Sequence, residues 1–136
     1  MAASAKELMI HSIPVYKFPV VIPKKPLRWA QLYYVHHDLT IEDINQSLQE
    51  RGCRPANAKD LQGFFKSNHQ ILPQMNSFEA ILATGNVEKI KVGYRMPAIL
   101  MDETKKGIKK VILGTATFSS KFINGHSAIF VFCLER

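Results

Sequence analysis

The chain has 136 residues, of which 46% are hydrophobic and 21% charged, and its formal net charge at pH 7 is +7. These values predict a single globular domain with an apolar core and exclude a chain that is disordered throughout. No apolar run approaches the roughly 18–20 residues that a membrane-spanning helix needs, so we expect no membrane span. Cys53 and Cys133 form no Cys-x-x-Cys motif. We therefore expect both to be reduced packing residues in a cytoplasmic protein.

The charge is distributed unevenly along the chain. Residues 1–37 carry a formal charge of +4, residues 38–88 carry −3 and residues 89–136 carry +6. Basic flanks around an acidic middle indicate an anionic partner such as nucleic acid, an acidic protein or membrane headgroups. The alternative is that lysines keep an edge hairpin soluble and prevent it from pairing with neighbouring molecules.

Residues 1–26 are predicted to form an extended N-terminal arm, followed by one α+β domain over residues 27–136. Four prolines, the last of them Pro26, exclude a helix in the arm, and the residues between them are largely apolar. The arm either covers its own domain or docks on a second chain as an added strand, which would give a protein partner or a homo-oligomer. Residues 27–35 then favour a strand because aromatic and β-branched residues dominate their second half.

Two short amphipathic helices are predicted in the acidic middle of the chain. The first covers residues 40–51, with Thr40 as its capping residue and Gly52 as its stop. Asn57 and Asp60 suit the start of a second helix over residues 58–67.

The remaining residues read as strands, and residues 128–134 are apolar on both faces, which predicts a central position in the sheet. The expected fold is α+β, with two short helices packed on an antiparallel β-sheet. The other predicted strands cover residues 78–83, 87–94, 98–101 and 108–115, with a hairpin loop at 102–107. The predicted core residues are Ile44, Leu48, Leu61, Phe64, Ile81, Ile99, Val111, Ile129, Val131 and Cys133.

No catalytic or metal-binding pattern is visible in the sequence. His36 and His37 are adjacent, and neighbours on a strand point to opposite faces. A metal site built from His37, His69 and Cys133 is conceivable, but no spacing selects it. We therefore assign no catalytic residue, metal or cofactor, and leave open an enzyme whose pocket the sequence does not display.

The most distinctive cluster is a set of lysines around the predicted hairpin: Lys89, Lys91, Lys105, Lys106, Lys109 and Lys110. Pairing of the strands is expected to gather these ammonium groups at one end of the sheet, where they would contact an anionic partner. The sequence thus favours a non-enzymatic binding or adaptor module that contacts a macromolecular partner through this basic hairpin and the adjacent loop surface. The alternative is a nucleic-acid-binding protein that uses its basic flanks for sequence-independent phosphate contacts.

A family resemblance is carried by the segment R-G-C-R-P-A-N at residues 51–57, followed by Asp60-Leu61 and Phe64. It resembles a group of small bacterial proteins with a G-[YF]-R-P-A-T-x-x-E-L-L motif, which in turn resemble prokaryotic C-type-lectin-like domains. The resemblance covers residues 40–136 and implies a scaffold whose loop surface binds a macromolecule. The family's tryptophans and its calcium and sugar ligands have no counterpart here, so no ligand residue is carried over.

Four residues of this segment are expected to have a structural role: Arg54, Pro55, Asn57 and Asp60. The guanidinium of Arg54 is expected to bond carbonyls left open at the end of the first helix.

Overall fold

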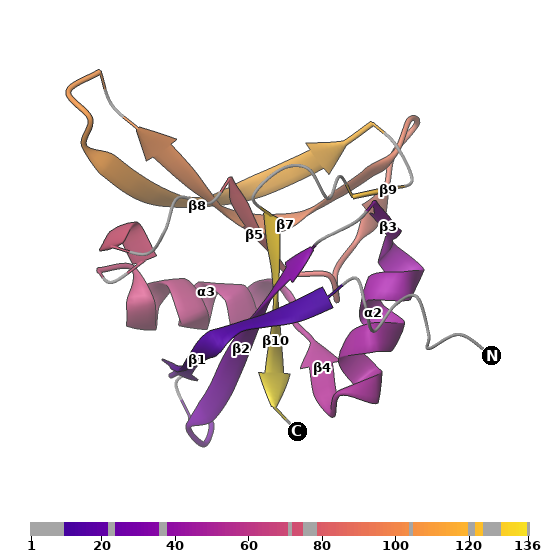
Figure 1. Cartoon of the computed structure of the whole chain (residues 1–136), viewed down its shortest axis with the longest axis horizontal. Helices are drawn as coiled ribbons and strands as arrows, with labels where there is room; N and C mark the ends of the chain where they lie inside the picture. Colours follow the sequence, from indigo (N-terminus) through magenta and orange to yellow (C-terminus); the bar gives the residue numbers. More distant parts are fainter. Residues whose placement is uncertain are drawn as a thin grey trace.

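The computed structural model of the chain (Figure 1) describes residues 10–21, 24–35, 38–70, 72–74, 79–103, 105–119, 122–123 and 129–135. It confirms the predicted α+β fold with two α-helices and a mostly antiparallel sheet. The strands are β1 (Ile10–Val20), β2 (Arg28–Val35), β3 (Leu39–Thr40), β4 (Cys53–Pro55), β5 (Ala80–Leu82), β6 (Glu88–Lys89), β7 (Tyr94–Glu103), β8 (Lys109–Phe118), β9 (Phe122–Ile123) and β10 (Ile129–Glu135). The helices are α2 (Ile41–Glu50), α3 (Ala58–Asn68) and the 3-10 helix η1 (Leu72–Gln74).

Strand β10 lies at the centre of the main sheet, as its apolar character on both faces predicted. The strand order is β1-β2-β10-β5-β7-β6, with β4 also paired to β10 and β8 paired to β7. The pairing of β5 with β10 is parallel, whereas the other described pairs are antiparallel. A parallel pair needs a long connection between its strands, and here the β7–β8 hairpin lies in that connection.

Each face of the sheet carries its own core and one helix. On β2, Tyr33 and Val35 belong to the cluster that α2 covers, whereas Ala30 and Leu32 belong to the cluster that α3 covers. Successive side chains of a strand point to opposite faces, so this alternation places the helices on the two sides of the sheet. Figure 1 shows α2 and α3 on either side of β10. All the residues predicted as core are buried.

The two α-helices begin at the capping residues that the sequence indicated. The Thr40 hydroxyl accepts a hydrogen bond from the Asp43 amide at 3.1 Å, and Asn57 forms a capping box with Asp60. Gly52 follows α2 with a φ of +76°, a conformation that favours glycine. Neither α-helix of the described residues is long and apolar enough to cross a membrane.

The predicted N-terminal arm is, over its described part, a strand of the domain's own sheet. Residues 10–20 form β1, which pairs antiparallel with β2, and Phe18 and Val20 are buried in the α3-side core. Phe18 also meets the ring of Phe64 edge-on, with 5.4 Å between the ring centroids. Residues 10–20 therefore cover their own domain, with Phe18 and Val20 buried in it, whereas docking of residues 1–26 on a second chain stays a prediction. Residues 1–9 and 22–23 of the predicted arm lie outside the described residues.

The strands predicted over 87–94 and 98–101 differ from those observed. Strand β6 has two residues, a loop follows, and one continuous strand, β7, runs from Tyr94 through Pro97 to Glu103. Gly93 causes the break, because its φ is +94° and a Cβ there would lie 1.7 Å from the carbonyl oxygen of Phe118. Pro97 is tolerated because it falls between the residues of β7 that pair with β6 and those that pair with β5.

Candidate functional site

The β7–β8 hairpin brings together four of the six predicted lysines. Lys105 and Lys106 are exposed in the turn, and Lys109 and Lys110 begin β8 directly after it. We call these four residues the basic tip. In Figure 1 the tip is the loop at the upper left, between β7 and β8. The expected concentration of ammonium groups at one end of the sheet therefore holds for four lysines.

Lys89 and Lys91 do not join the basic tip. In the sheet register Lys89 lies opposite Tyr94, which begins β7, whereas Lys109 lies opposite Glu103, which ends β7. At about 3.3 Å per residue, the length of β7 separates the two groups by roughly 30 Å. Lys91 lies in the loop after β6, so it is not on a shared strand face with Lys89 as the sequence had suggested. The six lysines therefore form two surfaces rather than one.

Two acidic residues reduce the charge of the basic tip. Asp102 is paired in register with Lys110, and Glu103 with Lys109. Side chains at directly opposite positions of antiparallel strands share a face and interact, so the Asp102 carboxylate lies beside Lys110. Counting these two residues with the basic tip leaves a formal charge of +2. This surface attracts anions less strongly than the lysine spacing in the sequence suggested.

The same hairpin presents a long sheet edge. Strand β8 has ten residues, and in the part of the chain that the structure describes it pairs with β7 on one side and with no strand on the other. Its segment 111–118 contains no charged residue and no proline. Proteins commonly protect such edges with lysines, prolines, bulges or a covering element, because unpaired backbone groups recruit other strands. Here lysines protect the first two positions of β8.

Side chains on both faces of β8 are exposed in its middle. Ile112 and Leu113 point to opposite faces of the sheet, and they are 39% and 40% exposed. Val111 is buried against the α3-side core and Ala116 against the α2-side core, so the strand is anchored on both sides of this exposed stretch. An exposed edge strand that carries apolar side chains is a template with which other strands pair.

The segment that carried the family resemblance forms a structural junction. Nη1 and Nη2 of Arg54 lie 3.0 and 3.4 Å from the two carboxylate oxygens of Asp60. The partner of Arg54 is thus this carboxylate, where the sequence suggested carbonyls at the end of the first helix. Pro55 belongs to β4, and Asn57 caps α3. These residues hold β4 against the start of α3, and their polar side chains form hydrogen bonds within this junction.

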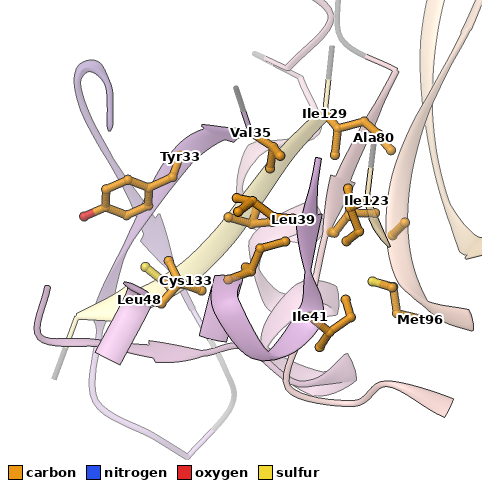
Figure 2. Packing of buried hydrophobic residues seen from close by; sticks show 14 of the residues in the cluster. Tyr33, Val35, Leu39, Ile41, Leu48, Ala80, Met96, Ile123, Ile129 and Cys133 are labelled. Atoms are coloured by element: carbon orange, nitrogen blue, oxygen red, sulfur yellow. The ribbon is translucent and has the colours of Figure 1, made fainter. Parts of the chain in front are cut away.

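A polar chain that the sequence did not predict lies on the α2 side of the sheet. The Tyr33 hydroxyl contacts Sγ of Cys53 at 3.8 Å and lies 2.5 Å from Oε1 of Gln31, to which it donates. Nε2 of Gln31 donates in turn to the Glu135 carboxylate at 2.6 Å. Figure 2 shows the Tyr33 hydroxyl pointing away from the apolar cluster, while Cys133 lies within it beside Leu48. The sequence indicated only that residues 29, 31, 33 and 35 share one strand face, which places Gln31 and Tyr33 side by side.

Cys53 and Cys133 are both free and buried, and their thiols interact. A hydrogen bond from Cys133, with a smaller contribution from the Tyr33 hydroxyl in contact with Sγ, lowers the pKa of the Cys53 thiol to about 7 against the opposing effect of burial. The same hydrogen bond and burial raise the pKa of Cys133 far above its usual value. Burial raises the pKa of Tyr33, and the neighbouring Cys53 adds to this effect. The pair therefore releases one proton near neutral pH and retains the other.

The described residues contain no group of three His, Cys, Asp or Glu side chains placed to hold a metal ion. His37, one member of the conceivable metal set with His69 and Cys133, lies outside the described residues. The polar chain contains the thiol of Cys53 and the hydroxyl of Tyr33. Cys53 and Cys133 are each about 1% exposed or less, so neither thiol is accessible to a substrate.

No protein-family model, curated protein or solved structure matches this chain.

Proposed function

We propose that the protein is a non-enzymatic binding or adaptor module that takes up an extended segment of a protein partner as an added strand along β8. The observation that carries the proposal is the unpaired edge of β8 among the described residues, with an uncharged and proline-free stretch over 111–118. In strand addition, main-chain hydrogen bonds supply affinity, and side chains at alternate positions supply specificity.

The exposed apolar residues indicate the composition of the added segment. Ile112 and Leu113 extend from opposite faces of the sheet, so a paired segment would place one apolar side chain beside each of them. Each apolar contact that removes about 50 Å² from water contributes about 1 kcal/mol. A segment with β-branched apolar residues at consecutive positions presents such a side chain on each face.

The basic tip indicates the charge of the partner. Lys105 and Lys106 are exposed in the turn, and the chain as a whole carries +7. An added segment with acidic residues at the end nearest this turn would gain Coulomb attraction, and its encounter rate would rise at low salt. The occupant is thus an apolar strand with an acidic flank.

A matched set of peptides and variants tests this function. A fluorescent peptide as long as β8, with valine and isoleucine at consecutive positions and a glutamate flank, should bind the full chain in an anisotropy titration. Leu113→Lys should weaken this binding about tenfold or more, because it places a charge beside the added strand. Val92→Lys is the control, since Val92 is 63% exposed in the loop after β6 and receives the same charge. Equal binding to both variants, or no binding to the parent chain, would reject the proposal.

A second candidate is phosphate contact by the basic tip, favoured by the four lysines that the hairpin gathers. It would be sequence-independent and strongly dependent on salt. The resemblance to C-type-lectin-like domains stays a prediction and contributes no residue to either candidate. We also propose a cytoplasmic location, which the two free cysteines support.

A further inference from the structure

A pocket lies at the end of the β1–β2 hairpin, away from the β7–β8 hairpin. It has a volume of about 330 Å³ and is lined by Lys25, Pro26, Leu27, Arg28, Trp29 and Glu135. Ligand pockets generally measure about 300–1,000 Å³, so this one is at the lower end of the range.

Trp29 supplies a flat aromatic surface to this pocket. It is 41% exposed, although Tyr33 and Val35, which share its strand face, are buried on the α2 side of the core. Leu27 beside it is 55% exposed. A tryptophan ring left partly open next to a second apolar side chain is a platform on which a planar ligand stacks.

Two cations and one carboxylate complete the pocket lining. Nη2 of Arg28 donates to the carbonyl oxygen of Glu135 at 3.0 Å, which fixes the guanidinium at the pocket wall. A guanidinium has five N–H donors, so this bond leaves donors for an anionic ligand group. Lys25 is exposed and adds a second positive charge. The Glu135 carboxylate accepts from Gln31, and it favours ligand groups that donate hydrogen bonds.

We propose that this pocket binds a nucleotide, with its base stacked on Trp29 and its phosphate contacted by Lys25 and Arg28. A sugar alone would pack on the indole of Trp29 but leave Lys25 and Arg28 without an anionic partner. A phosphate alone would use the cations but not the ring. The nucleotide is either free or one unit of a single-stranded nucleic acid, and both sources share this chemistry.

The chain's single tryptophan makes the test specific to the pocket. Titration of the full chain with AMP, GMP, CMP and UMP should quench Trp29 fluorescence with saturation, because a stacked base contacts the only indole. Ribose 5-phosphate and glucose, at the same concentrations, should leave the fluorescence unchanged. Absence of saturable quenching by all four nucleotides would overturn the proposal, as would equal quenching by ribose 5-phosphate or by glucose.

Charge-matched variants then separate the pocket from the general positive charge of the chain. Lys25→Gln should weaken nucleotide binding severalfold, whereas Lys24→Gln, which removes a neighbouring charge outside the pocket lining, should not. Trp29→Leu, followed by equilibrium dialysis with labelled nucleotide, should lose about 5- to 150-fold in affinity. Equal effects of Lys25→Gln and Lys24→Gln would overturn the proposal.

A comparison of ligands identifies the source of the nucleotide. A single-stranded oligonucleotide that binds much more tightly than the mononucleotide of the same base would identify nucleic acid as the source. Equal affinity would identify the free nucleotide. None of these measurements involves β8, so their outcome is independent of the proposed strand addition.

Discussion

Arg54 and Asp60 are joined by two hydrogen bonds across the turn between β4 and α3, at 3.0 and 3.4 Å. The side chain of Asp60 is 6% exposed, whereas that of Arg54 is 38% exposed. Oδ2 of Asp60 also accepts from the amide of Asn57 at 3.0 Å. One buried carboxylate thus joins the strand that precedes α3 to the cap of that helix.

Arg54→Met is expected to lower the free energy of unfolding by about 1–3 kcal/mol, because it leaves the Asp60 carboxylate buried without its cation. Partial exposure of Arg54 to solvent keeps the expected loss near the lower end of that range. Arg54→Lys should lose less, since it retains the charge but not the two-pronged geometry. Chemical denaturation measures both values, and a variant Arg54→Met as stable as the parent chain would show that the pair contributes nothing.

Phe64→Ala is expected to cost about 3–5 kcal/mol of stability, because the ring is fully buried in the α3-side core and contacts Phe18. Phe65→Ala, on the same helix but only partly buried, is the matched control and should cost clearly less. Thermal or chemical denaturation compares the two. Equal losses would indicate that the buried face of α3 is assigned incorrectly.

The pH dependence of stability should report the ionisation of Cys53 and Cys133. Because the pKa of Cys53 is lowered to about 7, the unfolded chain binds more protons than the folded chain between pH 7 and pH 9. The free energy of unfolding should therefore rise across this window, by at most about 2–3 kcal/mol. Above pH 9 the raised pKa of Cys133 reverses the sign, because the folded chain retains a proton that the unfolded chain loses.

Denaturation of the reduced protein at a series of pH values checks this profile. Cys53→Ala should abolish the rise, and Tyr33→Phe should diminish it by removing the hydroxyl that contacts Sγ of Cys53. A parent profile that is flat from pH 7 to pH 9 contradicts the assignment.

Salt dependence tests phosphate contact by the basic tip. If its four lysines contact a single-stranded oligonucleotide, log affinity should fall with log salt with a slope of about −2.8. Replacing all four with glutamine should flatten the slope, and it should change stability by no more than about 0.5 kcal/mol, since these are surface substitutions. The paired substitution Lys89→Gln and Lys91→Gln, at the other end of β7, is the control. A quadruple variant with the parental slope would exclude the tip as the contact.

Local patterns in the sequence were sufficient to predict both helices and the core. Thr40, Asn57 and Gly52 mark helix ends through contacts within a few residues, so the sequence displays them directly. The apolar character of residues 128–134 predicted a central strand for a similar reason, because a strand covered on both faces has no polar alternation.

Features that depend on contacts distant in sequence could not be predicted. Whether Gly93 ends one strand and Pro97 lies inside the next depends on Phe118 and on which segments pair with β7. The polar chain joins Gln31 and Tyr33 to Cys53 and Glu135, which are far apart in the sequence. The gathering of the lysines was only partly predicted, because the register that separates Lys89 from Lys109 is set by the whole length of β7.

Amide hydrogen exchange along β8 tests the central claim most directly, because strand addition must protect backbone amides that face away from β7. In the free chain, the amides over 111–118 that do not bond to β7 should exchange quickly. Addition of the glutamate-flanked peptide should slow alternate amides in this segment, and it should leave those of β1, the opposite edge strand, unchanged. Peptide binding without protection in β8, or with protection confined to β1, would contradict the account.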